Sequence, residues 1–167
     1  DDGRLEVFEL EDRGFTDVNA ISCLRGHNIC IVSSSLDGIG VIDQNHEIEW
    51  IGGYGYPWLD VVCHEGTPLE CVAVSSDLTI AVISIDQDDP TKSRIFENDI
   101  IQLQGVVGTM TGIDNLGSGR SLISVAPFAL IEHDSPLRRS FPWLENRDVA
   151  GTDVDLSGER IVFTWSS

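Results

Sequence analysis

Residues 28–50 read NICIVSSSLDGIGVIDQNHEIEW, and within this stretch short apolar segments alternate with turn residues. The apolar segments are rich in Ile and Val, which favour extended backbone. Asp37-Gly38 and Asn45-His46 are typical of the tight turns that join antiparallel strands. With the apolar segment that precedes it, the stretch predicts a meander of four strands at Asn19–Cys23, Ile29–Ser33, Ile39–Ile42 and Glu47–Ile51.

Similar short apolar segments follow along the chain, separated by Gly, Asp, Asn, Ser or Pro. No long window carries the 3.6-residue apolar stripe of an amphipathic helix. We therefore expect an all-β fold with little helix. The further predicted strands are Leu59–Cys63, Cys71–Ser75, Leu78–Ile85, Ser121–Val125, Phe128–Ile131 and Arg160–Trp165.

Part of the sequence repeats at a distance of about 40 residues. Cys23 and Cys30 bracket one predicted hairpin turn, and Cys63 and Cys71 bracket another, with similar residues after each pair. A period near 40 with about four strands in each unit is typical of β-propeller blades.

The stretch 28–50 also resembles blades of the WD-repeat and PQQ-type propellers, in which a turn glycine, a third strand ending in Asp and a tryptophan in the fourth strand recur. Gly38, Asp43 and Trp50 carry this resemblance, which identifies a superfold and leaves the family unresolved. It implies a β-propeller-like array of about four blades.

We expect a single domain over residues 1–167. Its repeats span approximately 14–55, 56–98 and 99–140, and a last unit combines 141–167 with 1–13. The last unit would be a composite blade, because the two ends of the chain each resemble part of a blade, and it would join the N- and C-termini into a closed ring. Two alternatives stay open: a β-sandwich, and half of a larger propeller that a second chain completes.

The composition limits the classes of function. The chain has 28 acidic against 10 basic side chains, a net charge of −18, and Lys92 is its only lysine. A nucleic-acid binder needs clustered Lys and Arg, so nucleic acid is not an expected partner. No apolar run is long enough for a membrane span. The dispersed acidity is typical of a halophilic surface, of a protein with a basic partner, or simply of a soluble protein.

The cysteines and one acidic turn are the candidates for structural bonds and metal. Each cysteine pair could form a disulfide across adjacent strands, whereas its spacing is unlike that of zinc knuckles; the alternative is four reduced, buried thiols. Asp153, Asp155 and Ser157 resemble part of the calcium loops found in FG-GAP-type blades, with an ordinary hairpin turn as the alternative. Residues 113–119 look like a degenerate copy. Calcium is the only cofactor that the sequence suggests.

Known catalytic motifs are absent from the sequence, and the four histidines are expected at strand ends without a catalytic role. We predict a non-enzymatic scaffold that presents loops to a protein partner. The alternatives are an extracytoplasmic propeller enzyme or carbohydrate binder that uses His64 and Glu65, and a structural subunit of a surface or virion assembly. The compartment stays open, with an extracellular or surface location favoured. The predicted contact residues are Tyr54, Tyr56, Trp58, Arg138, Arg139 and Trp143.

Overall fold

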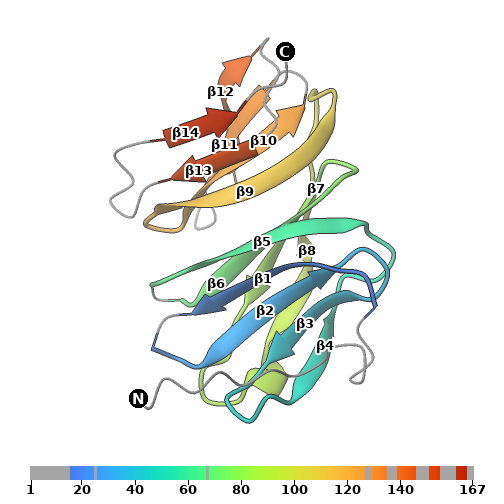
Figure 1. Ribbon diagram of the computed structural model, residues 1–167, viewed down its shortest axis with the longest axis vertical. Helices are drawn as coiled ribbons and strands as arrows, with labels where there is room; N and C mark the ends of the chain where they lie inside the picture. The colour runs from blue at the N-terminus through green and yellow to red at the C-terminus, as the bar shows by residue number, and fades with distance from the viewer. Residues whose placement is uncertain are drawn as a thin grey trace.

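The computed structural model of the chain describes residues 16–24, 26–66, 68–126, 129–134, 139–145, 151–154 and 161–164. Regular structure in these residues is almost entirely β-strand, and the one helical segment among them is a short 3₁₀ turn at Pro90–Lys92 (Figure 1). The predicted all-β fold is therefore confirmed. No helix in the described part of the chain has the length and apolar character needed to cross a membrane.

In the described residues the strands form three four-stranded antiparallel sheets and one two-stranded sheet. Within each sheet the strands lie side by side in chain order, so that hairpins connect all neighbours. The first sheet contains β1 (Val18–Leu24), β2 (Ile29–Ser34), β3 (Gly38–Ile42) and β4 (Ile48–Gly52). The second contains β5 (Trp58–His64), β6 (Glu70–Ser75), β7 (Thr79–Ser84) and β8 (Arg94–Gln102). The third contains β9 (Thr109–Gly117), β10 (Arg120–Ala126), β11 (Ala129–Asp134) and β12 (Arg139–Glu145), and the last contains β13 (Gly151–Val154) and β14 (Ile161–Thr164).

The sheets pack face to face in a row (Figure 1). Strand β5 contacts both β1 and β9, and β13 packs against β9. One core, which includes Ile31, Val41 and Trp58, lies between the first and second sheets. A second core, which includes Val82 and Ile123, lies between the second and third sheets. Successive meanders packed in this way are the blades of a β-propeller-like fold and not the two layers of a sandwich.

Two disulfides occupy equivalent places in the first two sheets. Cys23 lies directly opposite Cys30 on β1 and β2, and Cys63 lies directly opposite Cys71 on β5 and β6. Each pair is bonded, with Cα atoms 3.9 Å and 4.0 Å apart. The predicted local pairing of the four cysteines is confirmed.

Four strands of the structure have no counterpart in the sequence prediction: β8, β9, β12 and β13. Strand β8 is largely exposed, so it carries polar side chains where a buried strand would be apolar. Strand β9 includes Ile113–Gly117, and Ser118 and Gly119 form the turn after it. The interpretation of 113–119 as a degenerate calcium loop is therefore wrong.

The predicted composite blade combines 141–167 with 1–13, and residues 1–13 and 165–167 lie outside the described residues, so it stays a prediction. Among the described strands, the first sheet and the β13–β14 pair lie at opposite ends of the row (Figure 1).

Candidate functional site

The strand ends create two opposite faces of the molecule. One, which we call the loop face, carries residues 35–37, 53–57, 76–78 and 103–108, which connect β2 to β3, β4 to β5, β6 to β7 and β8 to β9. The other, which we call the turn face, carries residues 26–28, 43–47, 65–66, 68–69 and 85–93, together with 118–119. Loops that a rigid sheet positions are where binding residues concentrate.

The loop face bears three of the five exposed large hydrophobic side chains of the described residues. Leu36 is 69% exposed, Tyr54 is 65% exposed and Val107 is 80% exposed. They come from three separate connections: a turn of the first sheet, the loop to the second sheet and the loop to the third. Large apolar groups held at loop tips are typical of surfaces that a partner covers.

The loop that carries Tyr54 is held in place by Trp58, which is fully buried at the start of β5. The Trp58 indole Nε1–H donates to the carbonyl of Gly53 at 2.7 Å, and its backbone N–H donates to the carbonyl of Tyr56 at 2.9 Å. A Cβ on Gly53 would lie 2.8 Å from that indole nitrogen, so only glycine fits there. Tyr54 is therefore exposed on a fixed loop, which lowers the entropy that binding would cost.

The turn that carries Leu36 is fixed by polar contacts. Ser34 Oγ accepts hydrogen bonds from the backbone N–H groups of Leu36 and Asp37, and Asp37 accepts from the N–H and the hydroxyl of Thr16. The hydrogen bond from the Thr16 N–H is the main cause that lowers the pKa of Asp37, so this carboxylate is charged. A Cβ on Gly38 would lie 3.4 Å from Tyr54 Cδ1, which places the Tyr54 ring against this turn.

The predicted contact residues divide into three groups. Trp58 is fully buried and holds the loop, so it offers no surface to a partner, and Tyr56 is half-buried beside it with ring centroids 5.3 Å apart. Tyr54 alone of the three presents most of its ring. Arg139 and Trp143 lie on β12, and their side chains are not among those described; Arg138 lies outside the described residues.

The loop face also contains residues that sequence reasoning missed. Leu36 sits between two polar residues in a turn, and Val107 lies in a short segment flanked by Gly105 and Gly108. For both, the available signal was an apolar residue with turn-forming residues close on either side, because at a turn such a residue cannot reach the core of its own sheet.

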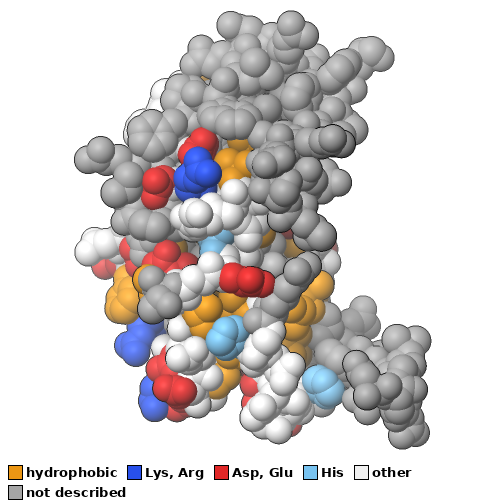
Figure 2. Space-filling view, turned by 90° about the vertical axis from the view of Figure 1, so that its left-hand side faces the viewer, with side chains coloured by type: hydrophobic (Ala, Val, Ile, Leu, Met, Phe, Trp, Pro, Cys, Tyr) orange, Lys and Arg blue, Asp and Glu red, His pale blue; other side chains and the backbone are white. Residues whose placement is uncertain are grey.

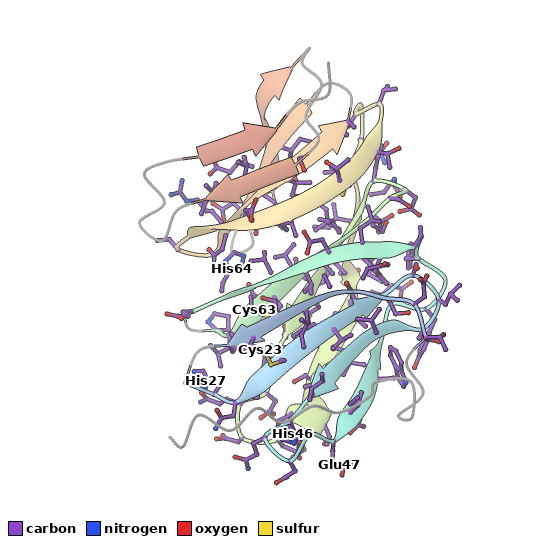
Figure 3. All side chains as sticks on the ribbon, viewed as in Figure 1. Cys23, His27, His46, Glu47, Cys63 and His64 are labelled. Atoms are coloured by element: carbon purple, nitrogen blue, oxygen red, sulfur yellow. A yellow bond between two sulfur atoms is a disulfide. The ribbon has the colours of Figure 1, made fainter. Side chains whose placement is uncertain are left out.

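The turn face has a different character. Figure 2, which views this side, shows acidic, basic and histidine side chains together. In Figure 3 Cys23, His27, Cys63 and His64 lie along this side, and Glu47 and His46 lie below them. The first disulfide is partly open to solvent through Cys23, whereas Cys71 of the second is fully buried.

His64 forms a buried polar cluster between the second and third sheets. The Asn115 amide Nδ2–H donates to the carbonyl of Cys63, so Asn115 Oδ1 is the acceptor that faces His64 Nδ1 at 3.0 Å. His64 Nδ1 therefore carries the hydrogen, and Nε2 accepts from the Ser121 hydroxyl at 2.8 Å. A hydroxyl on Nε2 and an acceptor oxygen on Nδ1 is the order of groups in the nucleophile–His–acceptor triads of hydrolases.

The cluster is nevertheless closed to a substrate. Ser121 is fully buried and His64 is 3% exposed, and Glu65, the predicted partner of His64 in an enzyme, is exposed and makes none of these contacts. Burial lowers the pKa of His64 below 6.5, against smaller opposing effects of Asn115 and Glu70. The arrangement joins two sheets through a neutral imidazole.

A second polar link joins the same two sheets. Asp60 Oδ2 on β5 accepts a hydrogen bond from the backbone N–H of Ile113 on β9, at 3.0 Å. Burial raises the pKa of Asp60, and the hydrogen bonds from Ile113 and Val61 oppose this effect.

The predicted calcium residues are only partly described. Asp153 belongs to β13, opposite Val162 on β14, and its side chain is not among those described; Asp155 and Ser157 lie outside the described residues. Within the described side chains, no group of three or more His, Cys, Asp or Glu residues is arranged to hold a metal ion.

The comparisons with known proteins agree with this arrangement. No family model and no curated protein matches the sequence. The structure is similar to the crystal structure of the Cps50 (Swd1) β-propeller domain of Myceliophteria thermophila, with a TM-score of 0.67 and 10% identity over 89% of this chain. It is also similar to Raptor of Chaetomium thermophilum, with a TM-score of 0.66 and 15% identity over 90% of this chain. The chain spans about half of the first of these chains (49%) and 15% of the second. The fold is therefore β-propeller-like.

Proposed function

We propose that the protein is a non-enzymatic scaffold whose loop face binds a protein partner. The observation that carries this proposal is the set of three hydrophobic tips, Leu36, Tyr54 and Val107, on one face of consecutive sheets. The carbonyl and indole contacts of the Tyr54 loop keep one of these tips fixed before binding. A preformed apolar surface of this kind favours association with another macromolecule.

Charge suggests the character of the partner. The loop face carries Asp17, Asp37 and Asp77 beside its hydrophobic tips, and the whole chain has a net charge of −18. A partner with an apolar centre and a basic rim would complement this face, and electrostatic attraction would speed its association at low salt.

The test compares two triple variants of the chain as bait for proteins from its source. The first variant replaces Leu36, Tyr54 and Val107 by serine. The matched control replaces three exposed residues away from this face, His27, Gln44 and Asn98, by serine. Folding of both is checked by near-UV circular dichroism, and the captured partner is then titrated as a purified protein by calorimetry.

We expect the purified partner to bind the native chain and the control with the same affinity. The loop-face variant should bind at least about 100-fold more weakly, because it loses the contacts of three anchor side chains. Equal affinity for the loop-face variant would contradict the proposal.

A second function, a subunit that completes a larger ring with another β-sheet body, is favoured by one specific observation. On β5, Val61 and Cys63 face the first sheet and are 4% and 8% exposed. On β1 the corresponding residues are Ile21, which matches Val61, and Cys23, which matches Cys63. Ile21 is 54% exposed. The face of the first sheet along β1 is thus an apolar surface where a preceding sheet would pack. Light scattering at low and high salt tests this: a mass of one chain at both would exclude self-completion of the ring.

The enzyme and carbohydrate-binding alternatives receive less support. Two histidine–serine pairs are hydrogen-bonded among the described residues, His64 with Ser121 and His133 with Ser140, and both histidines and Ser121 are buried. Hydrolysis of a panel of esters and glycosides by the native chain and by Ser121→Ala would contradict the scaffold proposal if the native chain alone were active.

A further inference from the structure

An open cleft of about 420 Å³ lies on the turn face, beside the outer edge of the second sheet. Its apolar lining comes from Leu69 and Ile85, which are half-buried and are joined by a hydrogen bond from the Ile85 N–H to the Leu69 carbonyl at 3.0 Å. Phe96, which is 49% exposed, forms another part of the lining. The cleft is thus separate from the loop face.

Basic side chains gather at this cleft. Among the described side chains only Lys92, Arg94 and Arg120 are basic, and the first two line the cleft. Figure 2 shows basic, acidic and hydrophobic side chains beside one another at the lower left of this face. On a chain with a net charge of −18, two neighbouring cations at one apolar opening are a local exception.

The two cations differ in how they are engaged. Lys92 Nζ lies 2.7 Å from Asp89 Oδ2, and this hydrogen bond raises the pKa of Lys92. The Arg94 guanidinium lies 5.6 Å from the centre of the Phe96 ring, and among the described residues no carboxylate forms an ion pair with it. Arg94 therefore keeps its full set of donors for an anion that enters the cleft.

The charge of the lining limits the kind of anion. Asp86 and Asp88 also line the cleft, and Asp86 Oδ1 is held in place by the N–H groups of Asp88 and Asp89. Two acidic and two basic side chains leave the lining with no formal charge. The single charge of a carboxylate would be balanced there by Arg94, whereas a phosphate dianion would keep one uncompensated charge and would meet stronger repulsion from the two aspartates.

The strand beside the cleft offers backbone groups as well. Strand β8 is the outermost strand of the second sheet among the described residues. Its register shifts between the pairs Ile83–Ile95 and Ala81–Ile100, so it bulges where Phe96 lies. An edge strand can pair with an extended segment of another chain where its ladder is regular, as at Arg94 and Ile95 before the bulge.

We propose that this cleft binds an extended peptide segment of a partner protein in which a leucine-like side chain adjoins an Asp or Glu. The apolar side chain packs on Leu69, Ile85 and Phe96, and the carboxylate accepts hydrogen bonds from Arg94. The site is independent of the loop face, so it can be occupied while that face is bound.

The test uses the full chain labelled with ¹⁵N and titrated with end-capped peptides that differ only at their centre: Leu-Asp, Leu-Asn, Ser-Asp and Leu-phosphoserine. We expect saturable shifts for Leu-Asp at residues 66–69 and 84–96. Leu-Asn and Ser-Asp should each bind about tenfold more weakly, because each lacks one of the two interactions.

Two variants distinguish a specific contact of Arg94 with the peptide from a general effect of removing one positive charge. Arg94→Gln should weaken Leu-Asp binding about tenfold, whereas Arg120→Gln, which removes a cation paired with Glu132 at 3.2 Å, should leave it unchanged. The proposal would be overturned by absence of saturable shifts up to about 5 mM peptide, by equal binding of Leu-Asn, by tighter binding of the phosphopeptide, or by equal effects of the two variants.

Discussion

The first and second sheets have nearly the same strands and equivalent disulfides, but they differ in what covers them. In the second sheet Val61 is 4% exposed and Cys63 is 8% exposed, because the first sheet packs on that face. In the first sheet the corresponding Ile21 is 54% exposed and Cys23 is exposed. The comparison teaches that burial depends on the neighbouring sheet and not on the apolar pattern of the strand itself.

The largest expected difference concerns the two disulfides. Replacing both Cys63 and Cys71 by alanine should lower the free energy of unfolding by about 3–5 kcal/mol, because the loss of the cross-link is added to a cavity in the core. The same change at Cys23 and Cys30 should cost only the cross-link, about 2–3 kcal/mol. Urea unfolding followed by tryptophan fluorescence measures both, and equal losses would mean that the two environments are equivalent.

A smaller difference is expected for the aliphatic pair. Val61→Ala should cost about 2 kcal/mol, because it opens a cavity between two sheets. Ile21→Ala should cost less than about 1 kcal/mol, because the Ile21 side chain is already half in water. If Ile21→Ala proves as costly as Val61→Ala in the same urea experiment, another part of the protein covers this face.

The next difference lies just after the disulfide cysteines, where Leu24 on β1 corresponds to His64 on β5. Because burial lowers the pKa of His64 in the folded state, the unfolded chain binds this proton more readily. The free energy of unfolding should therefore fall as the pH drops below about 6.5, by up to about 1.4 kcal/mol per pH unit. His64→Gln should remove this dependence, measured between pH 8 and pH 5. If the free energy of unfolding of His64→Gln depends on pH as strongly as that of the native chain, other groups cause the dependence.

The smallest effect is expected at Asp60, which corresponds to the apolar Ala20 of β1. Burial raises the pKa of Asp60 in the folded state, so its charged form opposes folding above the unfolded value near 3.8. Asp60→Asn retains an acceptor for the Ile113 N–H and removes the buried charge. We expect a gain in stability of less than about 1 kcal/mol at pH 7 that vanishes near pH 3. A marked loss at pH 7 would show that the Asp60 charge stabilises the link.

Much of the fold could be predicted from the sequence, because the strands of the first two sheets are apolar and lie between strong turn residues. The pairing of Cys23 with Cys30 followed from the same pattern. Strand β9 was missed because it contains polar residues such as Asn115, which hydrogen-bonds to His64 and to the Cys63 carbonyl of the second sheet. Outer strands such as β8 face solvent and so lack the apolar signal.

The site was less predictable. The glycine-rich loop around Tyr54 pointed to an exposed aromatic residue, but sequence could not tell that Trp58 turns into the core. Leu36 and Val107 come together on one face only through the packing of sheets. Arg94 and the β5–β6 turn line the same cleft only because the fold brings the start of β8 beside that turn.

The binding role of the loop face is tested most directly by amide hydrogen exchange of the native chain with and without its purified partner. We predict that protection on binding concentrates at residues 35–37, 53–57 and 103–108 and leaves 43–47 unchanged. Protection confined to the turn face, with residues 53–57 unaffected, would contradict this role.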